Sequence, residues 1–288
     1  MSKHLIFLVL LHLLLAKESR CYRPFLMIHG INSDYTSMHQ IKSWVNEDFP
    51  EMLTVSLDAF NNQYSIITLT TQVPHFAEMV KNITDIYGSV NLLGYSQGGI
   101  VARGVIEMGN NPNINNFISL SAPGLGEYGV PFLNSTGFFE NVLSGGVYKV
   151  CYNKAGQLIS GCNYWNDPNQ HELYLSKNVY LPFLNNEIKH ENSSKYKENF
   201  SNLSRLVLIG GPDDHVIQPW QSAQYSFWDE ELNVVPYNQL GYYTDDLFGL
   251  RALDEQGKIT FCTFPGVHHT HWPHNREVYE KCIRPYLG

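Results

Sequence analysis

One pentapeptide, Gly94-Tyr95-Ser96-Gln97-Gly98, limits what this chain can fold into more than any other feature of the sequence. It fits the pattern G-x-S-x-G, in which a serine stands on a sharp turn between a strand and a helix. The mostly apolar residues 90–93 precede it, and apolar residues between 100 and 106 recur at helical spacing. Because glycines flank the turn, the strand and the helix can approach closely. The sequence therefore predicts a strained turn that lifts the Ser96 hydroxyl out of a sheet.

Strands and helices alternate along much of the chain. The predicted strands are short apolar runs at residues 25–28, 53–57, 90–94, 117–120, 206–210 and 259–264. The predicted helices lie at residues 73–86, 100–106 and 276–283. This alternation predicts a mostly parallel sheet with helices on both faces. Together with the serine turn, it predicts an α/β-hydrolase fold.

The alternation stops between about residues 124 and 203, where Asn, Gly, Tyr and Phe are frequent and no clear strand occurs. We expect this segment to be an insertion that caps the sheet. The pattern resumes after it, and no low-complexity linker divides the chain. The sequence therefore predicts one domain over residues 21–288, with a capping insertion at about 124–203.

A serine hydroxyl is a poor nucleophile unless a histidine and an orienting carboxylate accompany it. In this fold the carboxylate and the histidine follow the serine in that order. The loop after residues 206–210 offers two aspartates, Asp213 and Asp214. The loop before the last helix offers four histidines, His268, His269, His271 and His274. Residue types and order alone leave both choices open.

Two backbone N–H groups are expected to stabilise the oxyanion of the reaction. One belongs to Gln97, directly after the serine. The other belongs to Ile31, in the sequence His29-Gly30-Ile31 that follows the first predicted strand. We expect the His29 side chain to hold this loop in place.

Neither a metal nor a cofactor is expected. The C-terminal histidines fit no zinc signature, and hydrolysis by an activated serine requires no metal. The formal net charge is −8 and no long basic run occurs, so nucleic acid is not an expected partner.

The N-terminus is typical of the secretory pathway. An apolar run from Leu5 to Ala16 fits a signal peptide over residues 1–20, with cleavage between about Ala16 and Arg20. No second apolar stretch is long enough to span a bilayer. Five acceptor sequences predict N-glycosylation, at Asn82, Asn134, Asn192, Asn199 and Asn202.

Five cysteines also suit an oxidising compartment. The close spacing of Cys151 with Cys162, and of Cys262 with Cys282, suggests two small disulfide loops. Cys21 is left over, close to the expected cleavage region.

Several longer motifs resemble the palmitoyl-protein thioesterase family, and within it the lysosomal type-2 branch. They cover nearly the whole chain after the signal peptide and are far more specific than the serine turn alone. The motifs are Gly94-Tyr95-Ser96-Gln97-Gly98-Gly99, Phe117-Ile118-Ser119-Leu120-Ser121-Ala122-Pro123, Cys162-Asn163-Tyr164-Trp165-Asn166-Asp167-Pro168, the stretch from Leu206 to Ser222, and Asp246-Leu247-Phe248-Gly249-Leu250-Arg251.

The resemblance implies choices that the residue pattern left open. Asp214 takes the family's catalytic aspartate position, five residues before Pro219. His269, followed by Thr270 and Trp272, takes the catalytic histidine position. The family also implies both disulfide pairings and residence in the lysosome. His215 and His268 depart from the family pattern beside these positions, and either could shift the pKa of its catalytic neighbour.

The expected function is hydrolysis of long-chain fatty-acyl thioesters through an acyl-serine intermediate. The acyl chain would need an apolar groove. Candidate groove residues are Phe132, Phe138, Phe139, Val142, Leu143 and Phe183. Two alternatives are an oxygen-ester lipase of the same fold and a non-catalytic lipid carrier. The presence of Ser96, Asp214 and His269 argues against the carrier. The sequence predicts no oligomeric state.

Overall fold

Six parallel strands form the central sheet of this computed structural model, which describes residues 22–109, 113–129 and 146–288. Their order across the sheet is β2-β1-β3-β4-β5-β8, and all five neighbouring pairs run parallel. The strands are β1 (Phe25–Ile28), β2 (Thr54–Ser56), β3 (Val90–Tyr95), β4 (Ile114–Leu120), β5 (Arg205–Gly210) and β8 (Ile259–Thr263).

Both faces of the sheet are buried, because successive side chains of each strand enter different hydrophobic cores. In β1, Leu26 and Ile28 join one core, whereas Phe25 and Met27 join the other. The first core is covered by α3 (Leu69–Tyr87), α4 (Gln97–Met108), α10 (Ser193–Ser201) and α12 (Leu250–Glu255). The second is covered by α2 (His39–Asp48) and by α13 (Arg276–Val278) with the turn that continues to Ile283. These layers are those of an α/β-hydrolase, as the sequence predicted.

The predicted elements are all present, but several boundaries differ. The helix expected at residues 73–86 begins earlier, at Leu69, and the fourth strand begins at Ile114. The closing helix is divided into α13 and a π-helical turn, Tyr279–Ile283. The elements that were not expected include α2 and, between β5 and β8, the hairpin of β6 (Phe227–Trp228) and β7 (Val234–Val235) and the helices α11 (Gly241–Thr244) and α12.

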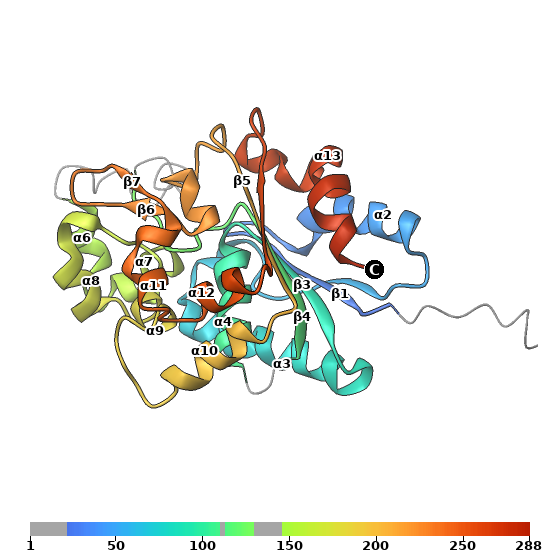
Figure 1. The fold of residues 1–288 in the computed structure, drawn as a ribbon, viewed down its shortest axis with the longest axis horizontal. Coiled ribbons are helices and arrows are strands. Elements are labelled where there is room, and N and C mark those ends of the chain that lie inside the picture. The colour runs from blue at the N-terminus through green and yellow to red at the C-terminus, as the bar shows by residue number, and fades with distance from the viewer. Residues whose placement is uncertain (1–21, 110–112, 130–145) are drawn as a thin grey trace, which may run out of the picture.

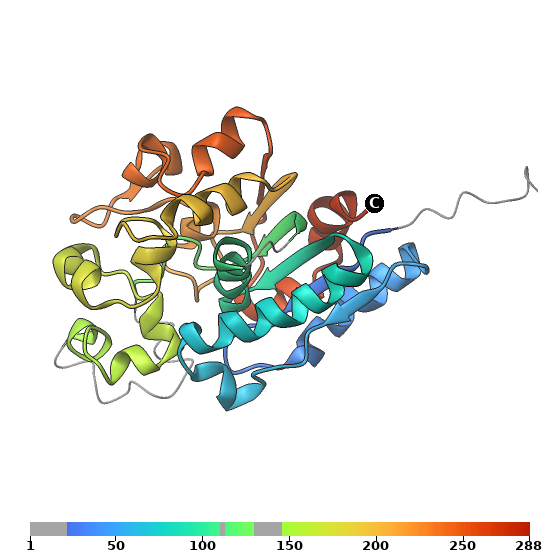
Figure 2. The same cartoon turned by 90° about the horizontal axis from the view of Figure 1, so that it is seen from below.

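Four short helices lie beyond the carboxyl ends of the strands, at the left of Figure 1 and of Figure 2. They are α6 (Val147–Cys151), α7 (Ser160–Asn163), α8 (His171–Lys177) and α9 (Leu181–Leu184). The predicted insertion at 124–203 also contains α10, which packs beside α4 in the helical layer. We use the name cap for residues 146–192, which contain α6 to α9 and end before α10.

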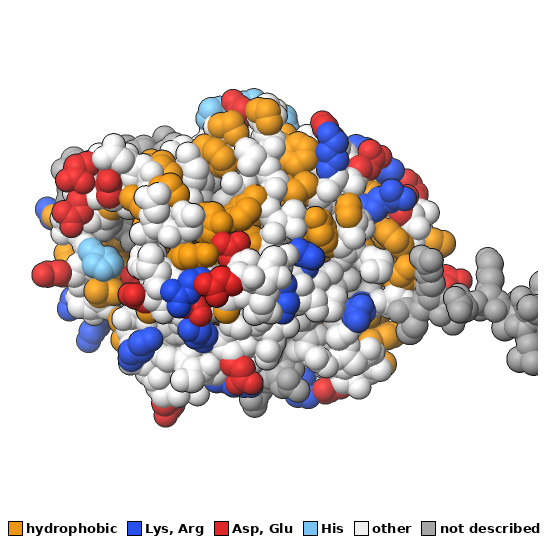
Figure 3. All heavy atoms as spheres, viewed as in Figure 1, with side chains coloured by type: hydrophobic (Ala, Val, Ile, Leu, Met, Phe, Trp, Pro, Cys, Tyr) orange, Lys and Arg blue, Asp and Glu red, His pale blue; other side chains and the backbone are white. Residues whose placement is uncertain are grey.

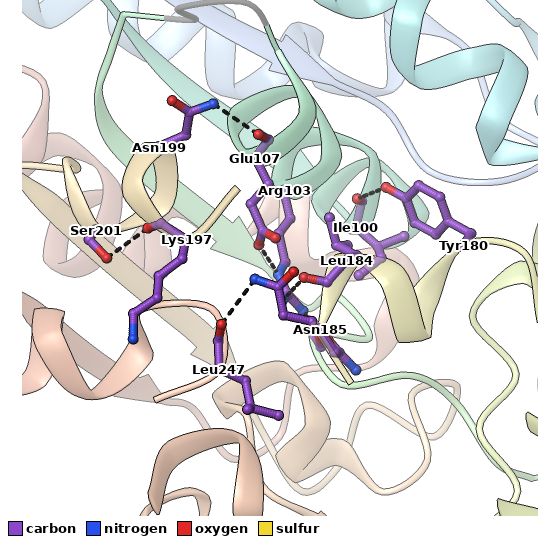
Figure 4. Close-up of polar contacts among 12 residues, drawn as sticks. Ile100, Arg103, Glu107, Tyr180, Leu184, Asn185, Lys197, Asn199, Ser201 and Leu247 are labelled. Atoms are coloured by element: carbon purple, nitrogen blue, oxygen red, sulfur yellow. Dashed lines mark hydrogen bonds and ion pairs between the residues drawn. The ribbon is translucent and has the colours of Figure 1, made fainter. Parts of the chain in front are cut away.

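Polar contacts fasten this cap to α4 (Figure 4). The Tyr180 hydroxyl donates to the carbonyl oxygen of Ile100 at 2.9 Å. Arg103 Nη2 donates to the carbonyl oxygen of Leu184 at 3.2 Å, and Arg103 Nη1 donates to that of Gly124 at 2.9 Å. Because α4 follows Ser96 directly, these contacts connect the cap to the helix that supports the serine turn.

The structure joins Cys151 to Cys162 and Cys262 to Cys282, the two pairs expected from the sequence. The first bond links α6 to α7 inside the cap, and the second links β8 to the C-terminal helical turn. Cys21 lies outside the described residues, as does the expected signal peptide.

The described part of the chain contains no helix with the length and apolar character needed to cross a membrane. On the face seen in Figure 3, Lys and Arg side chains lie interspersed with Asp and Glu.

Candidate active site

Ser96 occupies the turn between β3 and α4, with φ 54° and ψ −129°. A positive φ is strained for a residue with a Cβ, so the surrounding packing must hold this conformation. The adjacent glycines make that packing close. A Cβ on Gly98 would lie only 2.3 Å from the carbonyl oxygen of Ile28, and one on Gly94 would lie 2.3 Å from that of Gly98. The predicted strained turn is therefore built by contacts that only glycine allows.

His269 lies between Ser96 and Asp214. Its Nε2 is 2.8 Å from Ser96 Oγ. Its Nδ1 is 2.9 Å from each carboxylate oxygen of Asp214. The three side chains come from the turn after β3, the loop after β5 and the loop after β8, and all three residues are buried. This arrangement allows proton transfer from the serine hydroxyl to an imidazole that a carboxylate orients.

Four further donors surround the Asp214 carboxylate. The Trp272 indole N–H donates to Oδ2 at 2.6 Å, and the Ser121 hydroxyl donates to the same oxygen. The backbone N–H groups of Val216 and Ile217 donate to Oδ1 at 3.1 and 2.8 Å. Burial alone would raise the pKa of Asp214, but the contacts with His269, Ser121 and Ile217 outweigh it. The pKa of this carboxyl is consequently lowered, which keeps it ionised in acid.

Tyr95 fixes the position of the histidine. Its ring stacks on the His269 imidazole, with 5.4 Å between centroids, and its hydroxyl donates to the His269 carbonyl oxygen at 2.7 Å. Burial raises the pKa of Tyr95, so the hydroxyl stays protonated and remains a donor.

The other aspartate and histidines that the sequence offered do not join this arrangement. Asp213 accepts the backbone N–H of Gly266 at 2.7 Å and supports the loop. His268, His271 and His274 are exposed, although His274 reaches the rim of the catalytic cavity. The exposed ring of His215 lies 5.4 Å from that of His268.

The expected oxyanion donors lie on either side of the serine. Gln97 is the first residue of α4, so its N–H has no acceptor within the helix. Gly30 approaches Ser96 closely, since a Cβ on Gly30 would lie 3.0 Å from that of Ser96. Ile31 follows Gly30, and both line the same cavity as Ser96 and Gln97.

Side chains hold both oxyanion loops. The amide of Gln97 donates to the carbonyl oxygen of Ser65 at 2.8 Å and accepts from the Tyr164 hydroxyl at 3.2 Å. The His29 ring nitrogens lie 2.8 and 2.9 Å from the carbonyl oxygens of Gly30 and Ala59. The His29 side chain thus fills the structural position expected of it.

A cavity of about 350 Å³ opens onto the serine and the histidine. Part of its wall is apolar, and the aliphatic and proline residues there are Ile31, Pro123, Val216, Ile217 and Pro273. Its polar part includes Asn32, Ser33, Ser37, Glu127, Thr270 and His274. The cavity therefore offers a polar and an apolar surface to one bound molecule.

Of the six residues proposed for an acyl groove, Phe132, Phe138, Phe139, Val142 and Leu143 lie outside the described residues. Phe183 lies in the wall of a second cavity, of about 440 Å³, between α3 and residues 179–196. That cavity does not include Ser96, so the structure does not bring Phe183 to the catalytic serine.

The predicted glycosylation sites differ in accessibility. Asn82, Asn192 and Asn202 are exposed, and Asn134 lies outside the described residues. Asn199 is buried, and its amide nitrogen donates to the carbonyl oxygens of Glu107 and Gly109 at 2.9 and 3.1 Å. A glycan on this nitrogen would break these contacts, so the structure disfavours Asn199 as an acceptor, and its glycosylation stays a prediction to be tested.

Sequence reasoning missed the roles of Ser121, Tyr95 and Trp272, which hold Asp214 or His269. Tyr95 and Ser121 lay within the motifs already quoted, and Trp272 follows the candidate histidine His269 by three residues. Position at the carboxyl end of a strand was the available signal for Ser121.

No cluster of three or more His, Cys, Asp or Glu suited to a metal ion occurs among the residues that the structure describes.

Comparison with known proteins adds independent information. Residues 24–269 match the model of the family described as palmitoyl protein thioesterase. The lysosomal thioesterase PPT2 of Bos taurus is 39% identical over 275 residues, which are 95% of this chain and 90% of that protein. The lysosomal thioesterase PPT2 homolog of Drosophila melanogaster is 37% identical over 93% of each chain. Among solved structures, an esterase from Exiguobacterium antarcticum aligns with 92% of this chain and 91% of its own, at 13% identity and a TM-score of 0.49.

Proposed function

The chain belongs to the palmitoyl protein thioesterase family, and on that premise we propose that it is a lysosomal serine thioesterase that hydrolyses long-chain fatty-acyl thioesters. One observation carries the assignment of the chemistry. Ser96 Oγ lies 2.8 Å from His269 Nε2, while Asp214 lies 2.9 Å from the other ring nitrogen. The lysosomal location rests on the names of the relatives and on the N-terminal sequence.

In the first step His269 accepts the Ser96 proton, and Ser96 Oγ attacks the thioester carbonyl carbon. The ionised Asp214 keeps the imidazole in the required tautomer and stabilises its positive charge. The N–H groups of Gln97 and Ile31 receive the oxyanion. Each such donor contributes about 3–4 kcal/mol to transition-state stabilisation in other serine hydrolases.

The thiolate then leaves as the carbonyl reforms, and His269 returns the proton to sulfur. A thiol has a pKa of about 8.5, which makes it a good leaving group. Water attacks the acyl-serine in the second step, with His269 again as the base. The products are the free thiol, the fatty acid and the regenerated serine.

The apolar wall formed by Ile31, Pro123, Val216, Ile217 and Pro273 suits the part of the acyl chain next to the carbonyl. Each methylene buried there contributes about 0.8 kcal/mol to binding. The polar wall, with Asn32, Ser33 and Thr270, suits the amides or hydroxyls of a thiol leaving group. We propose that residues 146–192 form the cap over this cavity.

The test is release of free thiol from palmitoyl-CoA at about pH 5 and about pH 7, which span the range where histidine titrates. We expect wild-type protein to release thiol and Ser96→Ala to lose at least about a thousandfold in kcat. Ser37→Ala is the matched control. Ser37 lines the same cavity, but its hydroxyl donates to the carbonyl oxygen of Asp34 at 2.8 Å, so this variant should retain most activity.

Two outcomes would contradict the proposal. If folded wild-type protein cleaved oxygen esters but no thioester, the chain would be a lipase or esterase. If it bound fatty acids and cleaved neither, it would be a carrier.

A further inference from the structure

Glu127 lies where three segments of the active site meet. Its backbone N–H donates to the carbonyl oxygen of Tyr164, and its own carbonyl oxygen accepts from Asn166, both at 2.9 Å. The next residue, Tyr128, donates its N–H to the carbonyl oxygen of Gln218 at 2.9 Å. The segment after β4 is thus bonded to the cap on one side and to the loop that carries Asp214 on the other.

The Glu127 side chain adds a second bond to that loop. Its Oε1 accepts the backbone N–H of Gln218 at 3.0 Å. Its Oε2 is buried and has no hydrogen-bond partner in the part of the chain that the structure describes. The residue is 0% exposed and is one of the residues that line the cavity with Ser96 and His269.

A charged carboxylate in this position would be poorly compensated. One backbone donor is not enough to balance the loss of hydration, and none of the ion pairs among the described residues involves Glu127. Burial raises the pKa of Glu127 well above its ordinary value, the bond from Gln218 lowers it, and the charge of Asp214 raises it again. The charge of Glu127 would in turn raise the pKa of Tyr164 in the cap, and the other titratable side chains that line the same cavity include His269 and His274. In acid the side chain is therefore neutral.

The bond to Gln218 matters for catalysis because of what precedes Gln218. Val216 and Ile217 donate their N–H groups to Asp214 Oδ1, at 3.1 and 2.8 Å. Both residues also line the catalytic cavity. A contact that fixes the backbone of Gln218 therefore fixes two of the donors that orient the catalytic carboxylate.

We propose that Glu127 is a positioning residue whose neutral carboxyl holds residues 216–218 in the arrangement that orients Asp214. When Glu127 ionises, its uncompensated charge draws water or forces movement of this loop, and the N–H groups of Val216 and Ile217 lose their alignment. The active site is then assembled in acid and loosened as the pH rises. This inference rests on the thioesterase function proposed above.

The experiment is a profile of kcat/KM against pH from about 4.5 to 8, with palmitoyl-CoA, for wild type, Glu127→Gln and Glu127→Leu. Gln keeps the acceptor for Gln218 and cannot ionise. We expect Glu127→Gln to stay within about threefold of wild type at pH 5 and to lose less activity toward neutral pH. Glu127→Leu lacks the acceptor and should lose about 10- to 100-fold at every pH, as misplacement of catalytic groups does.

Glu187→Gln is the matched control. Glu187 is another carboxyl in the cap with a raised pKa, but its partners are Tyr174 and Asn185 instead of the Asp214 loop. This variant should keep the wild-type pH profile of kcat/KM. Circular dichroism and thermal melting of each variant show whether it is folded.

Two results would overturn the role of Glu127. One is a pH profile of Glu127→Gln that matches wild type, and the other is a folded Glu127→Gln that is inactive at every pH. Glu127→Gln decides the question even if Glu127→Leu does not fold. Failure of the thioesterase function is distinguishable, because wild-type protein would then release no thiol in the same assay.

Discussion

Arg103 and Glu107 form an ion pair inside the protein, with 2.6 Å between Nε and Oε1 and side chains that are 1% and 0% exposed. The same guanidinium donates to Asn185 Oδ1 at 2.8 Å and lies 4.0 Å from the ring centroid of Phe248. Burial raises the pKa of Glu107, while the charge of Arg103 and its hydrogen bond lower it and favour the ionised carboxylate. Figure 4 shows the Arg103 side chain extending from α4 toward Leu184 and Asn185 of the cap. One cation thus holds together the serine-bearing helix and the cap.

Replacing Arg103 by Met should lower the free energy of unfolding by about 3–5 kcal/mol, because the partners of the cation would be left buried without it. Urea denaturation measures the change. Lys81→Met is the control, since Lys81 pairs with Asp85 at the same i,i+4 spacing but with side chains 53% and 58% exposed. That variant should lose less than about 1 kcal/mol. Equal losses of unfolding free energy in the two variants would show that burial does not make the Arg103–Glu107 pair more important for stability than an exposed pair.

The Trp272 indole should support catalysis through Asp214. Trp272→Phe keeps an aromatic ring in the core but removes the N–H that lies 2.6 Å from Asp214 Oδ2. A hydrogen bond to a charged group is worth about 1.5–3 kcal/mol, so kcat/KM should fall about 10- to 100-fold. Because this donor lowers the pKa of Asp214, its loss should move the acid limb of the pH profile to higher pH.

Trp228→Phe is the control for that measurement, since Trp228 lies in the β6–β7 hairpin and packs against Tyr128. A fall in kcat/KM without any movement of the acid limb would assign Trp272 a packing role only.

The elements that sequence reasoning located well are those whose signal is local. The turn at Ser96 was visible because glycine, strand and helix patterns coincide within about a dozen residues. The strands before Asp214 and His269 were visible as apolar runs. The local pattern could not decide between Asp213 and Asp214, because both residues follow the same strand and only their tertiary contacts differ. Asp213 meets Gly266, whereas Asp214 meets His269 and Trp272.

The remaining features depend on contacts between distant segments. Glu127 reads as an ordinary polar loop residue, and only the approach of Gln218, 91 positions away, shows that its carboxyl is buried. Asn199 fits a glycosylation sequence, and only the packing of α10 on α4 shows that its amide is occupied. Phe183 was apolar and lay in the insertion, but apolar character does not specify which cavity a side chain lines.

Glycosylation should distinguish Asn199 from the exposed acceptor sites. In protein secreted from a eukaryotic host, Asn82→Gln and Asn202→Gln should each remove any glycan present at that site, which mass spectrometry detects. Asn199→Gln should leave the glycan mass unchanged. It should instead destabilise the fold by about 1–3 kcal/mol, because the carbonyl oxygens of Glu107 and Gly109 lose their donor. Loss of a glycan from Asn199→Gln would mean that α10 packs differently from the structure.

Glu187 should make the fold more stable in acid than at neutral pH. Burial raises the pKa of Glu187 to about 7 from an ordinary value of 4.5, against hydrogen bonds from Tyr174 and Asn185 that lower it. The folded protein therefore binds this proton more tightly than the unfolded chain does. The resulting stabilisation is complete below about pH 4.5 and is lost as the pH rises through about 7.

Urea denaturation of wild type and Glu187→Gln at about pH 5 and about pH 7 measures this contribution. One such group changes the free energy of unfolding by at most about 1.4 kcal/mol per pH unit, and the partial exposure of Glu187 makes the change smaller. Wild-type stability should fall more between the two pH values than that of Glu187→Gln, because Gln cannot ionise. Glu172→Gln, an exposed change on the cap helix α8, should keep the wild-type slope. Identical slopes for wild type and Glu187→Gln would show that this carboxyl is already ionised in the folded protein at pH 5.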